Sequence, residues 1–266
     1  MEKNYYGDLS IIGMKGSEKF LENVDWYLHQ WRQDKEGTFL VNADCPRFGS
    51  GEGKGIIHET LRGHDTYIFA DVFNYGVTYK MYGMNVPMSP DDHYQDLKRI
   101  ICAIGGKARR VSVIMPMLYE GRQHRRTARE SLDCAMALQE LDSMGISNII
   151  TFDAHDPRVQ QAIPRSGFDN VRPAYQMLKA LVREFSDITF DKDTMMIVAP
   201  DEGAMSRSMY YSSILGLELG MFYKRRNYTI VIDGRNPIEA HEFLGRSVEG
   251  KDIIIVDDMI ATGEST

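Results

Sequence analysis

An uninterrupted apolar run near the end of the chain limits the fold more than any other feature of the sequence. Residues 253–256 read IIIV, and Asp257 and Asp258 follow directly. β-Branched residues without polar alternation are typical of a strand covered on both faces, as strands of parallel α/β sheets are. We therefore expect an α/β fold in which residues 253–256 form such a strand.

Similar apolar runs alternate with helical patterns along the chain. Strands are predicted at residues 38–44, 66–72, 110–116, 148–155, 195–201, 221–225, 227–233 and 252–258. Helices are predicted at residues 89–106, 129–144, 173–185 and 204–216. In the first of these, Ser89 is an N-cap, Pro90 lies in the first turn, and Gly105 ends the helix. The alternation predicts mainly parallel sheets flanked by helices.

The number of predicted strands is large for one sheet. Residues 163–173, IPRSGFDNVRP, carry two prolines and a glycine and are the best place to divide the chain. We predict two similar domains, 1–163 and 164–266, of which the second is apparently incomplete.

Composition excludes some classes of function. The chain has 266 residues, of which 43% are apolar and 26% charged, as in soluble globular proteins. A formal charge of −7 argues against nucleic-acid binding, and no apolar stretch approaches the roughly 18 residues of a membrane span. We expect a cytoplasmic protein without a membrane partner. Cys45, Cys102 and Cys134 are expected to be core residues rather than ligands or disulfides.

Polar residues follow the predicted strands at five places. They are Arg122, Gln123 and their basic neighbours, His155, Asp201, Lys224 to Arg226, and Asp257 with Asp258. Carboxyl ends of parallel strands form ligand sites. Cations and carboxylates together suit a polyphosphate with Mg²⁺, although no Walker-type sequence or GxGxxG after a strand occurs.

Each of these groups also has a structural interpretation. The basic runs 122–126 and 224–226 would, taken alone, more often be solvated surface, and His155 could be a structural histidine. Asp257 and Asp258 differ, because adjacent carboxylates at the end of a buried strand repel each other and a plain turn would not favour them. For these two residues the functional interpretation is favoured.

The segment VDDMIATGES, residues 256–265, resembles the phosphoribosyl signature of the type I phosphoribosyltransferase fold. The resemblance implies that Asp257 and Asp258 hold ribose hydroxyls. It also implies that the loop Thr262 to Thr266, with Gly263 and Ser265, wraps the 5-phosphate with backbone N–H groups.

From about Phe48 to its end, the chain resembles the ribose-phosphate diphosphokinase family. Four segments carry the resemblance in the right order: FGSGE with LRGHDTYIFADV, MPMLYEGRQHRR, IITFDAHDPRVQQAIPRSGFDNVRPAY, and VAPDEGAMSRS. The resemblance implies two tandem phosphoribosyltransferase-like domains. The first, 1–163, would lie on the ATP side, and the second, 164–266, on the ribose 5-phosphate side.

The same resemblance implies roles for single residues. Arg122 and Gln123 would contact ATP, and Phe48 and Glu52 would approach the adenine from a neighbouring subunit of a homo-oligomer. His155 and Asp201 would serve Mg²⁺, and Lys224 and Arg226 would face the transferring diphosphoryl group. The implied reaction is attack of the ribose C1 hydroxyl on the β-phosphorus of ATP, releasing AMP.

Three residues depart from the family pattern: Ser50 and Ala261 each replace an acid, and His124 replaces the Asp of RQD. Three hypotheses therefore stay open. They are an active diphosphokinase, a transferase that uses phosphoribosyl diphosphate with a nucleobase, and a non-catalytic homologue that regulates an active partner. The presence of Lys224, Arg226, His155 and Asp201 favours the first.

Overall fold

The computed structural model describes residues 6–33, 37–226 and 238–260, with the backbone alone for residues 224–226 and 238–241. The chain divides into two compact units, Met1–Arg172 and Pro173–Thr266, each with its own sheet. The predicted boundary between residues 163 and 164 precedes β10 (Gly167–Val171), which pairs with β9 (Asn148–Phe152) in the first sheet. The chain therefore leaves the first sheet only after β10.

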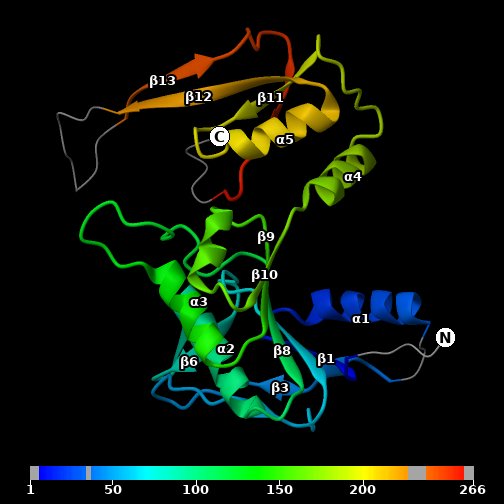
Figure 1. Cartoon of the computed structure of the whole chain (residues 1–266), viewed down its shortest axis with the longest axis vertical. Coiled ribbons are helices and arrows are strands. Elements are labelled where there is room, and N and C mark those ends of the chain that lie inside the picture. Colours follow the sequence, from blue (N-terminus) through cyan, green and yellow to red (C-terminus); the bar gives the residue numbers. More distant parts are fainter. Residues whose placement is uncertain (1–5, 34–36, 227–237, 261–266) are drawn as a thin grey trace. The chain divides into compact units, whose positions relative to one another are not determined.

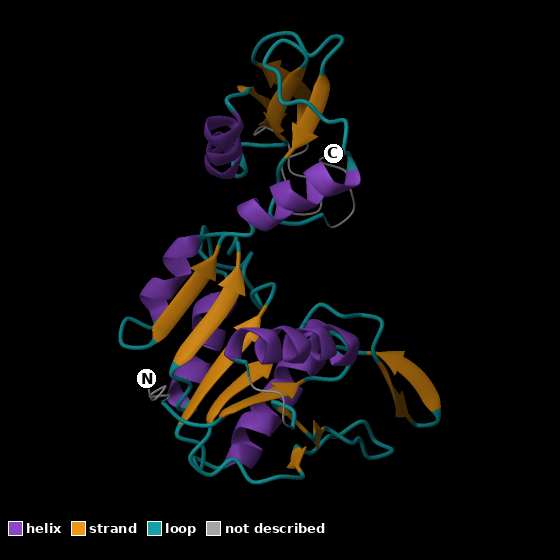
Figure 2. Cartoon of the chain, turned by 90° about the vertical axis from the view of Figure 1, so that its right-hand side faces the viewer, coloured by secondary structure: helices purple, strands orange, loops and turns teal. Residues whose placement is uncertain are grey.

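The first unit is built on a six-stranded sheet. Its order is β10, β9, β8 (Arg110–Met115), β5 (Asp65–Phe69), β1 (Leu9–Gly13) and β2 (Leu40–Val41). All five neighbouring pairs are parallel, and the arrows in Figure 2 point the same way. The predicted parallel α/β architecture is confirmed.

Helices cover both faces of this sheet (Figure 1). Leu97 of α2 (Pro90–Ile104) and Leu138 of α3 (Asp133–Ser143) pack in one core with Ile12 and Ile68. On the opposite face, Leu21 of α1 (Glu18–Arg32) packs with Ile11 and Phe69. Successive strand residues thus enter different cores, as the two-residue period of a strand requires.

The predicted caps of α2 are confirmed. The Ser89 hydroxyl accepts from the Asp92 N–H, and the Asp92 carboxylate accepts in return from the Ser89 N–H, which is a capping box. Gly105 ends the helix at φ 62°, a left-handed conformation that glycine adopts without steric cost.

Two short antiparallel hairpins and a 3₁₀ helix complete the first unit. The pairs are β3 (Ala43–Asp44) with β4 (Ile56–Ile57), and β6 (Thr78–Met81) with β7 (Met84–Pro87), while η1 covers Pro157–Ala162. The predicted strand 38–44 is therefore two strands, because β2 joins the parallel sheet and β3 turns away to pair with β4.

The second unit has a four-stranded sheet and two helices. The strand order is β13 (Ile238–Leu244), β12 (Glu218–Arg226), β11 (Met195–Ala199) and β14 (Asp252–Ile255). β11 is parallel to both of its neighbours, whereas β12 and β13 are antiparallel. Ala174 of α4 (Ala174–Glu184) and Tyr211 of α5 (Met205–Leu215) share a core with Ile197.

β14 lies at the edge of its sheet, and Ile253 and Ile255 are 42% and 38% exposed, so the prediction of a strand covered on both faces is wrong for the described part of the chain. Cys102 is exposed and is not a core residue, whereas Cys134 is buried.

The predicted strand 227–233 lies outside the described residues. Across the described ranges, no helix has both the length and the apolar content to span a membrane.

Candidate functional site

The loop after β8 carries the first group of predicted site residues. Arg122 is exposed there, whereas the Gln123 side chain donates to the Ser131 carbonyl at 2.8 Å. The Gln123 N–H also donates to the carbonyl of Glu120 at 2.9 Å. Gln123 therefore holds the loop together, and Arg122 is the member of the pair that is exposed to solvent.

A histidine pair lies where the ends of β8 and β9 meet. These strands are parallel neighbours, so their carboxyl ends share one edge of the sheet. His124, from the loop after β8, and His155, from the loop after β9, have ring centroids 5.3 Å apart. His124 Nε2 lies 3.5 Å from a carboxylate oxygen of Asp156. The fold thus brings His155 together with His124, one of the three departures from the family pattern.

Asp156 is anchored by a second cation. Its carboxylate accepts two hydrogen bonds from Arg158 Nε, at 2.9 and 3.1 Å, and one from Nη2 at 2.5 Å. Hydrogen bonding to Arg158 lowers the pKa of Asp156 to about 2, and His124 adds to this effect. Asp156 is therefore ionised at neutral pH beside His124. Sequence reasoning missed this residue, although it directly follows His155.

The FGSGE loop, residues 48–52, is held in one conformation by its own backbone. The Phe48 N–H donates to the Glu52 carbonyl at 2.7 Å, and the Gly51 N–H donates to the Phe48 carbonyl at 2.9 Å. The Ser50 hydroxyl donates to the Glu52 carboxylate at 2.8 Å. Phe48 is 57% exposed, so the loop presents an aromatic ring and a hydrogen-bonded carboxylate to solvent.

The β6–β7 hairpin supports this loop from one side. The Tyr82 N–H donates to the Gly49 carbonyl at 2.8 Å. Gly51 has φ 94°, and a Cβ added there would lie 2.9 Å from the sulfur of Met81. Glycine is therefore required at position 51 for its conformation and for the close approach of the hairpin.

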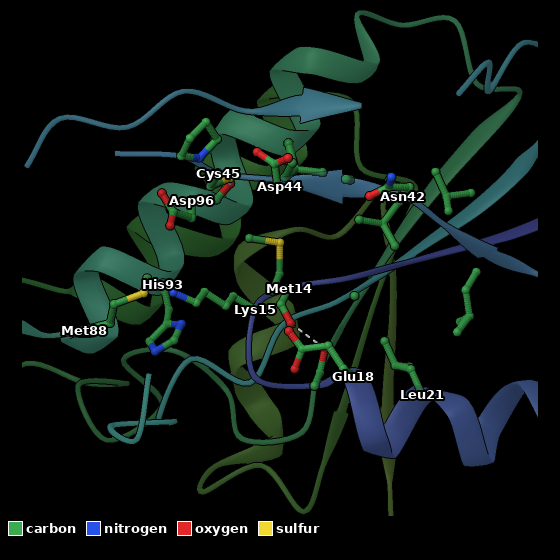
Figure 3. A pocket seen from close by; sticks show the side chains of 18 of the residues that line it. Met14, Lys15, Glu18, Leu21, Asn42, Asp44, Cys45, Met88, His93 and Asp96 are labelled. Atoms are coloured by element: carbon green, nitrogen blue, oxygen red, sulfur yellow. Dashed lines mark hydrogen bonds between the residues drawn. The ribbon is translucent and has the colours of Figure 1, made fainter. Parts of the chain in front are cut away.

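The first unit also contains a cavity of about 810 Å³ off the ends of β1 and β2. Figure 3 shows Glu18 and Leu21 of α1 on one side of it, and Met88, His93 and Asp96 on the other. Glu18 accepts from the Gly16 N–H at the start of α1, and Lys15 Nζ donates to the Thr78 carbonyl. None of the predicted site residues lines this cavity.

The second unit gathers acids at the carboxyl ends of β11 and β14, which are parallel neighbours. Asp201 follows β11, and its carboxylate accepts from the Ala204 N–H at 3.1 Å. Burial raises the pKa of Asp257 above its ordinary value, and Asp258 and Asp201 contribute to this rise. The electrostatic conflict predicted for Asp257 and Asp258 is therefore present in the folded chain.

Arg207 of α5 partly offsets this negative charge. Its Nη1 lies 3.8 Å from Asp258 Oδ1, and its side chain is 13% exposed. Sequence reasoning did not select this residue. The signal was available, because Arg207 lies in the VAPDEGAMSRS segment that follows β11.

The remaining predicted site residues are described in part or not at all. Lys224 and Arg226 lie within β12, opposite His241 and Ile238 of β13, so the expectation that they follow a strand end is wrong. Their side chains lie outside the described part of the chain. The phosphate-loop residues also lie outside it, namely Ala261, Thr262, Gly263, Ser265 and Thr266.

The predicted magnesium pair divides between the two units. His155 belongs to the first unit and Asp201 to the second, so their joint role stays a prediction. Within the ranges that the structure describes, no three or more His, Cys, Asp or Glu side chains form a group that could hold a metal ion.

The family model for the N-terminal domain of ribose phosphate pyrophosphokinase matches residues 9–145, more than half of the chain. The chain belongs to the ribose phosphate pyrophosphokinase family. A second family model, for the phosphoribosyl transferase domain, matches residues 169–265. The predicted pair of phosphoribosyltransferase-like domains is thereby confirmed.

Named relatives belong to the same family. Ribose-phosphate pyrophosphokinase 1 of Streptococcus pyogenes serotype M3 is 24% identical over 265 residues, which cover 97% of this chain and 71% of the relative. Ribose-phosphate pyrophosphokinase of Fusobacterium nucleatum is 26% identical over 254 residues, which cover 95% of this chain and 72% of the relative.

A solved member of the family shares the fold. The crystal structure of phosphoribosylpyrophosphate synthetase from Mycobacterium smegmatis superposes with a TM-score of 0.75 at 20% identity. The match covers 97% of this chain and 74% of that one. Both predicted domains therefore have counterparts in a ribose phosphate pyrophosphokinase fold.

Proposed function

We propose that this chain is a ribose-phosphate diphosphokinase. It transfers the diphosphoryl group of ATP to the C1 hydroxyl of ribose 5-phosphate, giving 5-phosphoribosyl 1-diphosphate and AMP. Family membership supports the proposal. The observation that carries it is the group of acids at the ends of β11 and β14, where burial and like charge raise the pKa of Asp257. Neutral hydroxyl groups that donate hydrogen bonds to these carboxylates stabilise their negative charge. A further anion would instead increase the repulsion between them.

Asp257 and Asp258 hold the sugar in this proposal. Carboxylates accept hydrogen bonds from the ribose hydroxyls, and Arg207 lies within ion-pair distance of Asp258. Thr262, Gly263, Ser265 and Thr266 form the loop that receives the 5-phosphate through backbone N–H groups.

ATP lies on the side of the first unit. Arg122 is exposed after β8 and neutralises phosphate charge, and Gln123 fixes the loop that carries it. The exposed ring of Phe48 stacks on adenine, and Glu52 approaches the same base. Both act on a neighbouring subunit, so the protein is a homo-oligomer with nucleotide sites at subunit interfaces. We also place it in the cytoplasm.

The residues assigned to the metal suit a divalent cation. Asp201 offers the oxygen ligand that Mg²⁺ prefers, and the Ala204 N–H orients its carboxylate. His155 offers a nitrogen ligand at the edge where β8 and β9 end. When bound, Mg²⁺ neutralises charge on the ATP phosphates. Asp201 and His155 would each offer a ligand to the cation, and Lys224 and Arg226 would approach the diphosphoryl group.

The test is an assay of the full chain with ATP, Mg²⁺ and ribose 5-phosphate, followed by detection of AMP. AMP formed only in the presence of the sugar supports the proposal. The matched control is the Asp257→Asn, Asp258→Asn variant, which should form none. Binding of both substrates without turnover would instead favour the regulatory homologue. Pyrophosphate release from phosphoribosyl diphosphate and a nucleobase would favour the nucleobase transferase.

A further inference from the structure

The cavity off the ends of β1 and β2 lies at the topological switch point of the first sheet. β1 leads into α1, which packs on one face through Leu21, whereas β5 leads towards α2, which packs on the other face through Leu97. β1 and β5 are parallel neighbours, so the connections diverge at this pair of strands. Open α/β sheets bind ligands in the crevice beyond the strand ends at such a point. The position therefore predicts a ligand site, although no residue assigned to ATP or ribose 5-phosphate lines it.

The cavity has the size and the apolar lining of a small-molecule site. Its volume of about 810 Å³ lies within the roughly 300 to 1,000 Å³ that is typical of ligand pockets. Met14 and Leu21 come from the β1–α1 segment, and Met88 lies on the other side of the cavity, just before α2 (Figure 3). All three side chains are buried. Methionine side chains adapt to the shape of a ligand and contact aromatic rings favourably, so this lining favours a flat aromatic body.

His93 of α2 contributes an unused hydrogen-bond acceptor to the wall of the cavity. Its side chain lines the cavity and is 3% exposed. Nε2 lies 2.9 Å from the Asn74 carbonyl oxygen, which can only accept, so Nε2 carries the proton. The neutral ring then has a lone pair at Nδ1, and no group in the described part of the chain donates to it. A buried acceptor without a partner is unfavourable unless a ligand donates to it.

Access to this nitrogen is open. The fully enclosed imidazole nitrogens without a partner are Nδ1 of His64 and Nδ1 of His124, and His93 Nδ1 is not one of them. His93 Nδ1 therefore keeps accessible surface, which a ligand in the cavity can reach.

Ser17, at the start of α1, adds acceptor capacity from another wall. It is 4% exposed, and its hydroxyl donates its proton to the Met14 carbonyl. The lone pairs of the hydroxyl oxygen remain available. Both buried polar groups thus offer lone pairs rather than protons, so a ligand must supply the N–H donors.

The charges around the cavity are nearly balanced. Its lining has three cations and four acids, namely Lys15, Arg47, Lys80, Glu18, Glu22, Asp44 and Asp96. Arg47 and Asp96 already form an ion pair with each other. A phosphate would be repelled by the acids and a polycation by the lysines, so an uncharged ligand is favoured.

We propose that this cavity binds an uncharged, amino-substituted heteroaromatic ring, the class to which aminopurines and aminopyrimidines belong. The amino group donates to His93 Nδ1, Ser17 offers a further acceptor, and the ring lies among Met14, Leu21 and Met88. The remaining volume admits a substituent on the ring. The inference goes beyond the proposed function, because the residues of this site are separate from those assigned to ATP and the sugar.

The experiment is a fluorescence titration of the full chain with 2-aminopurine. Saturating ATP with Mg²⁺, without ribose 5-phosphate, fills the proposed nucleotide site beforehand. We expect saturable binding of one equivalent under these conditions. Purine, which has the same ring without the amino group, should compete about 2-fold to 10-fold more weakly, as loss of one hydrogen bond predicts. Absence of saturable binding in the presence of ATP, or equal affinity for the two ligands, would overturn the proposal.

A variant and its control locate the site. His93→Gln keeps an amide N–H for the Asn74 carbonyl but removes the ring acceptor, so it should weaken 2-aminopurine binding by about 2-fold to 10-fold. The matched control is His29→Gln, at a half-buried histidine of α1 that does not line the cavity, and it should bind as the wild type does. Melting curves establish that both variants are folded. Wild-type affinity in folded His93→Gln would refute the site.

A second measurement on the wild type needs no variant. In a chain labelled with ¹⁵N in its histidine rings, 2-aminopurine should shift the Nδ1 signal of His93 and leave that of His29 in place. An unchanged His93 signal at saturation would contradict the proposal. AMP formation is measured separately, so failure of the diphosphokinase reaction and failure of this site are distinguishable.

Discussion

The guanidinium of Arg47 lies 2.8 Å from the carboxylate of Asp96, and the two side chains are only 8% and 5% exposed. Arg47 also donates to the Gly51 carbonyl at 3.3 Å, and its guanidinium lies 4.7 Å from the centre of the Tyr79 ring. Because Arg47 directly precedes Phe48, this buried pair anchors the FGSGE loop to helix α2 and to the β6–β7 hairpin.

Asp96→Ala should destabilise the first unit by about 3 to 5 kcal/mol, because it leaves buried positive charge without its partner. Arg47→Ala should cost less, since Arg99 still pairs with Asp96 at 2.5 Å. Urea denaturation of the full chain measures both. The control is Lys98→Ala, on the same helix as Asp96. It removes a partly exposed pair with Glu140 of α3 and should cost about 0 to 1 kcal/mol. If Asp96→Ala costs no more than this control, the anchoring role is refuted.

Asp257→Asn combined with Asp258→Asn should weaken binding of ribose 5-phosphate and leave ATP binding unchanged. The carboxylates accept from sugar hydroxyls, and hydrogen bonds to charged groups contribute roughly 1.5 to 3 kcal/mol each. Calorimetric titration of the two ligands separates the effects. Unchanged affinity for the sugar would remove the assignment.

The pKa of Asp257 also predicts a pH dependence in the absence of substrate. Because burial and Asp258 raise this pKa, the folded chain binds more protons than the unfolded chain between the ordinary pKa and the raised one. The free energy of unfolding of the second unit should therefore fall as pH rises through that window. Asp257→Asn should remove this fall, whereas Asp252→Asn, an exposed position of β14, should keep it. Urea denaturation between pH 4 and 7 provides the check, and an identical pH slope in wild type and Asp257→Asn would contradict it.

Lys224→Ala should lower kcat by about 10² to 10⁴, while KM for ribose 5-phosphate changes little. A cation that acts on charge redistributed in the transition state contributes to kcat rather than to ground-state binding. Steady-state kinetics and a melting curve on the same sample test this, with Lys179→Ala, an exposed lysine of α4, as the control. A near-normal kcat in Lys224→Ala would show that Lys224 has no catalytic role.

The three cysteines should differ sharply in reactivity. Burial raises the pKa of the Cys45 and Cys134 thiols to about 12, so only about one molecule in 10⁴ is a thiolate at pH 8. Cys102 is exposed on α2. Iodoacetamide at pH 8 should modify one thiol rapidly, as counted by mass spectrometry, and Cys102→Ser should abolish that phase. Rapid modification of all three cysteines would contradict the raised pKa values of Cys45 and Cys134.

The sequence by itself determined the elements with strong local signals. Helix α2 has a capping box at Ser89 and a glycine at its end, so both boundaries follow from short-range chemistry. β11 consists only of apolar residues and is buried along its whole length, as its pattern predicts. The acids at the ends of β11 and β14 could be identified because a parallel sheet collects its strand ends at one edge. The order of the family motifs indicated the two-domain organisation in the same way.

Tertiary structure decided what depends on partners distant in sequence. Ile253 and Ile255 are exposed because β14 forms the edge of its sheet, and no local pattern specifies strand order. Lys224 and Arg226 lie within a strand because their part of β12 pairs with β13. This pairing extends β12 beyond the apolar residues from which a strand was predicted. The pair formed by Arg47 and Asp96 spans 49 positions, and the contact of His124 with His155 requires two adjacent strands to end together. Such contacts arise from packing and charge pairing across the fold, so the local sequence around a residue does not predict them.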